Sequence, residues 1–123
     1  MASFPVVVHH NPGCGTSRKV IAAVREAGLE PVIIEYLKTG WTRGQLQALF
    51  AVAGRGARDF LRDKEALVEE LGLATPAADA AEDEARLLDA MVAHPILVNR
   101  PIVASPSGVA LCRPAELVQE LLP

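Results

Sequence analysis

Apolar residues recur with two different periods along this chain, and the periods separate strand-like from helix-like segments. "FPVVVH" at 4–9 and "PVIIEYL" at 31–37 are short runs rich in β-branched residues, which is typical of buried strands. Between them, "TSRKVIAAVREAG" repeats apolar residues every three or four positions from Thr16 and ends at Gly28, which predicts an amphipathic helix. The first third of the chain therefore predicts a β-α-β unit.

The middle of the chain, at about 43–94, shows only the helical period. The segments "RGQLQALFAVAG", "ARDFLRDKEALVEELGL" and "AEDEARLLDAMVAH" all place apolar residues three and four positions apart. We expect a helical insert there. Within it, the Ala- and acid-rich stretch at 74–85 predicts a surface loop that leads into the N-terminus of a helix, where acidic residues are favourable.

The last part of the chain returns to strand-like runs. "RPIVAS" and "VALCRP" surround the turn signal "SPSG", and "AELVQELL" predicts a closing helix. The predicted order is β-α-β, then helices, then β-β-α, in an α/β fold. Because 123 residues, 50% of them hydrophobic, are enough for one core, we expect residues 1–123 to form a single domain.

Charge and cysteine content narrow the classes of function. A net charge of −3 argues against a nucleic-acid or membrane-surface role, since either normally requires a strongly positive face. Two cysteines and no signal-peptide pattern predict a reducing, cytoplasmic setting. No apolar run approaches the ~20 residues that cross a bilayer. The basic residues are 9 Arg and 3 Lys, a ratio that suits oxyanion binding but also fits a codon bias.

The candidate chemistry lies in "HHNPGCGTSRKV", where Cys14 stands between two glycines at the predicted start of a helix. Unpaired backbone N–H groups and the helix dipole at such a start stabilise a thiolate, which is the nucleophilic form of cysteine. His10 lies close in the sequence, and Thr16 and Ser17 are expected to cap the helix. The alternative is that Cys14 is a small buried hydrophobic residue beside a glycine turn.

Cys14 has no second cysteine at the spacing of a local disulfide. A Cys-x-x-Cys pair would require cysteine where Asn11 and Ser17 stand. Cys14, Cys112 and His10 do not have the spacing of a zinc site either, so we expect no metal and no tightly bound cofactor. If Cys14 is redox active, its electrons come from Cys112 or from an external thiol such as glutathione.

Three blocks in order, "HNPGCGTSR", "HPILVNRPIV" and "LCRP", resemble the glutaredoxin-coupled bacterial arsenate reductases nearly from end to end. The resemblance implies a thioredoxin-like fold with an all-helical insert, arsenate as substrate, glutathione as co-substrate and glutaredoxin as protein partner. It implies that Cys14 attacks arsenate and forms a covalent thiol-arsenate adduct, and that His10 lowers the pKa of Cys14. It also implies a cis peptide bond before Pro101.

The same resemblance assigns oxyanion binding to Arg62 in "DFLR", Arg100 in "VNRP" and Arg113 in "LCRP", together with Gly15 and Thr16 at the helix start. Planar guanidinium groups offer paired donors that match the oxygens of arsenate. Two of the arginines also have a simpler interpretation, Arg62 as the solvated surface of a helix and Arg113 as a cap of the hairpin end.

Two other functions of the same fold stay open. Redox-responsive regulators that bind RNA polymerase resemble the chain less, since their switch uses the Cys-x-x-Cys pair that is missing here. A general glutathione-dependent thiol oxidoreductase has no need for three arginines, whereas arsenate reduction needs them to bind substrate and stabilise charge on oxygen. We therefore expect a monomeric arsenate reductase, with Arg100 directed at Cys14 and Cys112 in a structural role.

Overall fold

The computed structural model describes residues 3–123 and divides the chain into two compact units. The sheet unit comprises Met1–Thr39 and Arg100–Pro123, and the helical unit comprises Gly40–Asn99. The helical unit corresponds to the insert that the sequence predicts at 43–94. That the two units make one domain stays a prediction.

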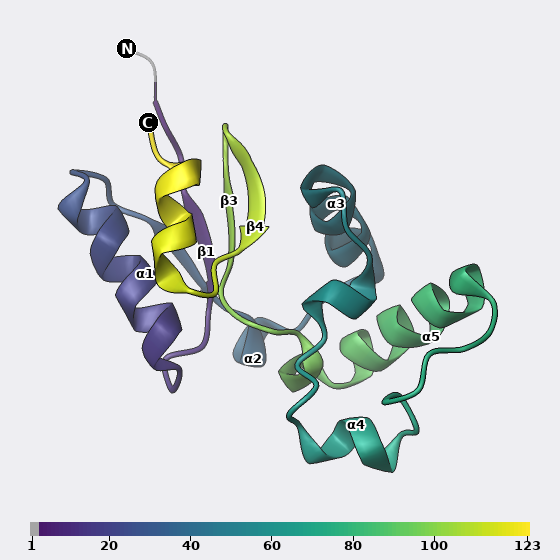
Figure 1. Ribbon diagram of the computed structural model, residues 1–123. Helices are drawn as coiled ribbons and strands as arrows, with labels where there is room; N and C mark the ends of the chain where they lie inside the picture. Colours follow the sequence, from purple (N-terminus) through teal and green to yellow (C-terminus); the bar gives the residue numbers. More distant parts are fainter. Residues whose placement is uncertain (1–2) are drawn as a thin grey trace. The chain divides into compact units, whose positions relative to one another are not determined.

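The sheet unit contains a mixed four-stranded sheet among the described residues. Its strands are β1 (Val7–His10), β2 (Val32–Glu35), β3 (Ile102–Ser105) and β4 (Gly108–Leu111), in the spatial order β2-β1-β3-β4. β1 is parallel to β2 and antiparallel to β3, and β3 is antiparallel to β4. Figure 1 shows β1, β3 and β4 of this sheet. The order of the elements along the chain confirms the predicted α/β fold.

Helix α1 (Gly15–Glu26) forms where the sequence predicts it. The apolar side chains that it buries are Val20, Ile21 and Val24. Ala27 follows as the C-cap of the helix and is exposed. Gly28 follows with a φ of 85°, a left-handed conformation that ends a helix and that glycine adopts without strain.

The closing helix, η3 (Ala115–Leu121), is a 3₁₀ helix. Its inward positions are Ala115, Val118 and Leu121, which recur every three residues, and three residues per turn is the period of a 3₁₀ helix. These side chains join a core with Val8 of β1 and Val103 of β3. α1 and η3 therefore lie side by side and share this core (Figure 1).

The predicted second strand is shorter than its apolar run. β2 ends at Glu35, and the chain turns at once into the short helix α2 (Tyr36–Thr39). β2 is also an edge strand, so its side chains are less covered than those of β1, and Val32 and Ile33 are 54% and 38% exposed.

The helical unit contains α3 (Arg43–Ala53), η1 (Ala57–Phe60), α4 (Ala66–Glu70), α5 (Ala80–Ala93) and η2 (Pro95–Leu97). α3 begins with a capping box in which Thr42 and Gln45 exchange side chain–backbone hydrogen bonds. α5 begins at the N-cap Asp79, and its first turn contains Glu82 and Asp83, as the acid-rich stretch predicts.

The run "ARDFLRDKEALVEELGL" does not form one helix. η1 and α4 are separated by a short extended segment, in which Leu61 forms an isolated antiparallel bridge with Val98. Arg58 connects η1 to α5, because its Nε and Nη2 donate to the Asp83 carboxylate at 3.1 and 2.7 Å. The Arg58 side chain and the Ala77 N–H hold the pKa of Asp83 well below its usual range.

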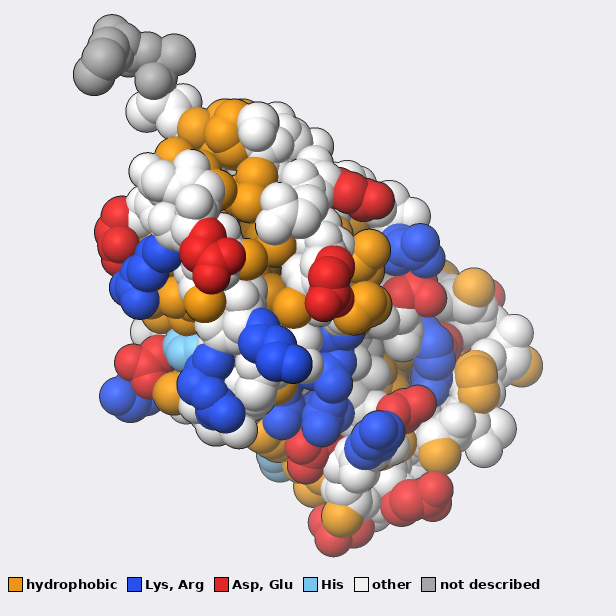
Figure 2. Space-filling model, turned by 60° about the vertical axis from the view of Figure 1, so that its left-hand side comes forward, with side chains coloured by type: hydrophobic (Ala, Val, Ile, Leu, Met, Phe, Trp, Pro, Cys, Tyr) orange, Lys and Arg blue, Asp and Glu red, His pale blue; other side chains and the backbone are white. Residues whose placement is uncertain are grey.

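The surface carries both signs of charge. Figure 2 shows basic and acidic side chains interspersed on one face of the molecule, in keeping with the small net charge of −3. Within residues 3–123, no helix combines the length and the apolar character that crossing a membrane requires.

Candidate active site

Strand pairing brings distant parts of the sequence to one end of the sheet. Because β1 and β3 are antiparallel, the loop after β1 lies at the end of the sheet where β3 begins. β4 is antiparallel to β3 and therefore finishes at that same end. As a result, the loop that carries Cys14 meets the two ends of the β3–β4 hairpin, which carry Arg100 and Arg113.

The loop before α1 is held by hydrogen bonds that centre on Asn11. Its carbonyl accepts from the Cys14 N–H at 2.9 Å, its Oδ1 accepts from the Gly13 N–H at 2.9 Å, and its own N–H donates to Ser17 Oγ at 3.2 Å. These bonds leave Cys14 as the N-cap of α1, in an extended conformation. The expectation that Thr16 or Ser17 caps the helix is wrong, because both lie inside its first turn.

The two glycines beside Cys14 provide space and do not require an unusual backbone. Neither Gly13 nor Gly15 is among the glycines with positive φ. A Cβ at Gly13 would lie 3.3 Å from Asn11 Oδ1, so a side chain there would crowd the turn. A Cβ at Gly15 would make only an ordinary contact, at 3.7 Å, with Nη2 of Arg18.

The Cys14 sulfur is surrounded by hydrogen-bond donors. Nη1 of Arg113 lies 3.5 Å from Cys14 Sγ and also donates to the Arg100 carbonyl at 3.1 Å. Burial raises the pKa of the Cys14 thiol, but the Ser17 N–H, the guanidinium groups of Arg100 and Arg113 and the Thr16 N–H together lower it from 9.0 to about 7. Cys14 is therefore ionised to a far greater extent at neutral pH than an ordinary cysteine.

The side chain of Arg100 is one of the hydrogen-bond donors that lower the pKa of Cys14, in keeping with the expectation that Arg100 is directed at Cys14. The peptide bond between Arg100 and Pro101 is cis, which confirms the expectation from the resemblance, and the bond between Arg113 and Pro114 is also cis. The structure thus brings Cys14, Arg100, Arg113 and the start of α1 together. Their roles toward an oxyanion stay predictions.

His10 lies at the end of β1, and its Nδ1 is 2.7 Å from Ser17 Oγ. Burial lowers the pKa of His10, with Glu35 raising it and Arg18 lowering it, so the ring is mainly neutral at pH 7. His10 is not among the groups that lower the pKa of Cys14. The role that the resemblance gives to His10 therefore stays a prediction, and the observed contacts of His10 lead to Ser17.

Cys112 lies in a very different environment. Its side chain is fully buried in the core of the sheet unit, and its Sγ is 3.8 Å from the Ala110 carbonyl. Burial and the charge of Glu120 raise the pKa of Cys112 to about 12. Both cysteines are free thiols. Cys112 is thus part of the core, as expected.

Arg62 belongs to the helical unit, and it does not lie on a helix. Its backbone N–H donates to the Leu97 carbonyl at 2.8 Å in the extended segment beside the isolated bridge. Its Nη1 donates to Asn99 Oδ1 at 3.3 Å, and its Nε lies 3.6 Å from Glu65 Oε1. The interpretation of Arg62 as the solvated face of a helix is therefore wrong, while its role in oxyanion binding stays a prediction.

The structure gives two residues of the loop, Asn11 and Ser17, contacts that the sequence does not predict, since Asn11 is expected only as a position without cysteine and Ser17 only as a helix cap. For Asn11 a signal exists, because an asparagine two residues before a glycine is typical of a turn closed by the asparagine side chain. For Ser17 there is no such signal, since its partners lie on a different element. Across residues 3–123, no group of three or more His, Cys, Asp or Glu side chains could hold a metal ion.

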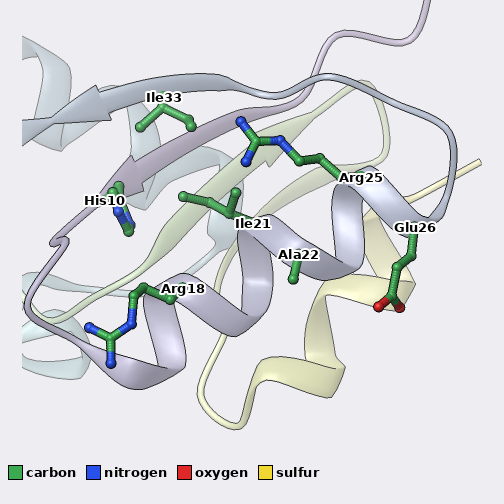
Figure 3. A pocket seen from close by; sticks show the side chains of 7 residues that line it. All are labelled: His10, Arg18, Ile21, Ala22, Arg25, Glu26 and Ile33. Atoms are coloured by element: carbon green, nitrogen blue, oxygen red, sulfur yellow. The ribbon is translucent and has the colours of Figure 1, made fainter.

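A pocket of about 570 Å³ lies between α1 and β2, next to the Cys14 loop. It is lined by His10, Arg18, Ile21, Ala22, Arg25, Glu26 and Ile33 (Figure 3). Arg18 connects the pocket to the loop, because its Nη1 donates to the Pro12 carbonyl at 2.7 Å. Cys14 itself does not line the pocket, so the pocket neighbours the sulfur site and is distinct from it.

The fold and the site together define a class of protein. The sheet is thioredoxin-like, and a thiol at the start of a helix has its pKa lowered toward neutrality by two neighbouring guanidinium groups. The ArsC family matches residues 9–121 of the chain. The arsenate reductases of Rhizobium meliloti (strain 1021) and Escherichia coli (strain K12) are 48% and 49% identical over 118 residues, which is 96% of this chain and 81% of each relative.

Among solved structures, the arsenate reductase from Vibrio cholerae superposes with a TM-score of 0.88 at 34% identity, covering 98% of this chain and 100% of that one. The chain belongs to the ArsC family. This membership confirms the resemblance found in the three sequence blocks, together with the thioredoxin-like fold.

Replacing Arg100 or Arg113 by alanine should raise the pKa of Cys14, because the thiolate loses a charged donor in either variant. We expect an upward shift of roughly one unit for each. Cys14 should then react more slowly with iodoacetamide at pH 7 and at the wild-type rate well above pH 9. The pH dependence of the alkylation rate measures the shift.

Arg25→Ala is the matched control, since Arg25 is an exposed arginine of α1 that pairs with Glu30. Its alkylation profile should coincide with that of the wild type. Profiles of the Arg100 and Arg113 variants that also coincide with the wild type would contradict the assigned electrostatics.

Proposed function

We propose that this chain is an arsenate reductase with Cys14 as its nucleophile. The observation that carries the proposal is the position of Cys14 at the start of α1 with Nη1 of Arg113 3.5 Å from its sulfur, an environment that lowers the pKa of the thiol to about 7. The same donors that stabilise a thiolate also suit a tetrahedral oxyanion, because both are anions that accept hydrogen bonds. The curated relatives at 48% and 49% identity carry the name arsenate reductase, which agrees with this chemistry.

In the proposed first step, the Cys14 thiolate attacks arsenic, and a sulfur–arsenic bond replaces one arsenic–oxygen bond. The departing oxygen takes up protons and leaves as water. Arg100, Arg113 and the N–H groups of Gly15 and Thr16 bind the remaining oxygens and stabilise the charge that collects on them. Arg62 enters this set on the strength of the family resemblance.

Reduction then requires two electrons from two thiols. Glutathione replaces a second oxygen on arsenic, again with loss of water. A glutaredoxin thiolate attacks the sulfur of the bound glutathione and forms a mixed disulfide, and the electron pair of the broken sulfur–arsenic bond reduces As(V) to As(III). Hydrolysis of the bond to Cys14 releases arsenite and restores the thiol.

Reductants from outside the chain are favoured by the positions of its own sulfurs. Ser17 occupies the position of the second cysteine of a Cys-x-x-Cys pair. Cys112 is fully buried, and its pKa of about 12 keeps it protonated, so it is a poor attacking thiol. Both observations support glutathione and glutaredoxin over an internal disulfide.

Purified protein should produce arsenite from arsenate in the presence of glutathione, glutaredoxin and a system that recycles oxidised glutathione. Cys14→Ser should reduce the rate to background, because the nucleophile is lost. Cys112→Ala should keep the rate within about twofold, since that residue only fills the core. Arsenite can be followed by chromatography coupled to elemental mass spectrometry.

Two results would contradict this account. If the wild-type protein produces arsenite only at the background rate, it is not an arsenate reductase. The alternative is then a general glutathione-dependent thiol oxidoreductase, which can be assayed by the reduction of a mixed disulfide with glutathione. If a folded Cys112→Ala variant has no activity, the mechanism uses an internal disulfide between Cys14 and Cys112 in place of the external thiol.

Arg62→Ala should lower kcat/KM for arsenate by on the order of tenfold or more, as expected for the loss of a charge-assisted hydrogen bond. Arg43→Ala is the control, because Arg43 is an arginine of the same unit that pairs with Asp89. If the two variants have the same steady-state kinetics as the wild type, Arg62 is not an oxyanion ligand.

A further inference from the structure

Ser17 lies at the centre of a small buried network that links His10 to the Cys14 loop. Its side chain is fully buried, although a serine is polar. Its hydroxyl oxygen is 2.7 Å from Nδ1 of His10 and accepts the Asn11 N–H at 3.2 Å. The backbone N–H of Ser17 is a hydrogen-bond donor to the Cys14 sulfur and lowers the pKa of the thiol. One residue therefore contacts the end of β1, the loop and the sulfur.

The direction of the bond between Ser17 and His10 follows from counting protons. The hydroxyl has one proton to donate and already accepts one bond from Asn11. If Nδ1 of His10 carried a proton, it would also donate to the hydroxyl, and the buried hydroxyl proton would be left without an acceptor. A buried donor without a partner is costly, so the satisfied arrangement is Ser17 O–H donating to an unprotonated Nδ1.

The surroundings of His10 agree with this neutral tautomer. Glu35 favours the charged ring, whereas burial and the positive charge of Arg18 disfavour it, and the net effect lowers the pKa of His10. Figure 3 shows His10 at the end of β1 facing α1, with Arg18 on the neighbouring turn of the helix. The proton of the neutral ring then sits on Nε2.

We propose that Ser17 is a positioning residue for the Cys14 thiolate: its hydroxyl donates to neutral His10, accepts from Asn11, and so holds its own N–H at the Cys14 sulfur. His10 then acts on Cys14 as a hydrogen-bond acceptor that orients Ser17, and not as a positive charge. The inference rests on the proposed function only in taking Cys14 as the nucleophile, since the geometry itself does not involve arsenate.

The Ser17 hydroxyl is not one of the groups that face the Cys14 sulfur, so its effect on the pKa of Cys14 can be distinguished from that of a charge next to the sulfur. Arg100 and Arg113 approach from the two ends of the β3–β4 hairpin, and Thr16 and Ser17 from the first turn of α1. Removing the Ser17 hydroxyl changes none of these charges. The proposal therefore attributes a change in the ionisation of Cys14 in Ser17→Ala to a changed position of the N–H groups, and the His10 variants below test whether the charge of His10 contributes.

The first test compares Ser17→Ala with Ser105→Ala, which removes another hydrogen-bonded serine of the sheet unit, whose Oγ donates to the Leu121 carbonyl at 2.6 Å. Ser17→Ala should shift the midpoint of Cys14 alkylation upward by about half a unit to one unit. Ser105→Ala should leave it unchanged. An unshifted midpoint in folded Ser17→Ala would overturn the proposal.

The second test needs only the wild-type protein. Nitrogen-15 NMR of the histidine rings should show Nδ1 of His10 unprotonated and Nε2 protonated at pH 7. A protonated Nδ1, in either the other tautomer or the charged ring, would overturn the proposed direction of the bond.

The third test keeps the proposal falsifiable if Ser17→Ala does not fold. In His10→Asn, the amide oxygen can stand in the place of Nδ1 and accept from Ser17, but the side chain cannot become charged. His10→Asn should keep the pKa of Cys14 near 7, while His10→Ala should raise it. Equal upward shifts in both variants would show that the charge of His10 matters, and would overturn the proposal.

These readouts are independent of catalysis. If arsenate is not reduced while the alkylation and NMR results are as expected, the proposed function fails and the positioning role of Ser17 stands. If arsenate is reduced but the pKa of Cys14 is unchanged in Ser17→Ala, the proposed function stands and the positioning role of Ser17 fails.

Discussion

The register of β3 between β1 and β4 is the constraint on which the site depends. Val8 pairs with Val103, and Ile102 pairs with Leu111, so the end of β1, the start of β3 and the end of β4 coincide. A slip by one residue would turn the buried side chains of β3 outward, so the core enforces this register. The same core therefore fixes the approach of Arg100 and Arg113 to Cys14.

At that end of the sheet, the ionisation of Cys14 is a balance between two opposing effects. Burial disfavours the thiolate, and oriented N–H and guanidinium donors favour it by a larger amount, so the pKa falls to about 7. Cys112 is the internal comparison, because burial without such donors raises its pKa to about 12. The chemical difference between the two cysteines comes from their surroundings, and it explains why one is proposed as the nucleophile and the other fills the core.

Periodicity predicts the elements whose apolar side chains face one core, such as β1, α1 and α5, because burial imposes the period of the backbone on the sequence. It does not predict the break between η1 and α4, where an extended segment around Leu61 pairs with Val98 from a distant part of the chain. Spacing cannot place Arg113 on Cys14 either, since 99 positions separate them and only strand register connects them. Only the family resemblance points to the arginines. The contact between His10 and Ser17 depends on how α1 packs beside β1, which no local pattern encodes.

The central claim is that surrounding donors make Cys14, and not Cys112, a thiolate near neutral pH. Carbon-13 NMR of protein labelled at the cysteine Cβ positions follows both side chains in one pH titration. The account predicts that the Cys14 signal shifts with a midpoint of about 7, while the Cys112 signal stays constant until strongly alkaline pH, as its pKa of about 12 requires. A Cys14 midpoint at the ordinary value of 9.0, or a Cys112 signal that titrates first, would contradict it.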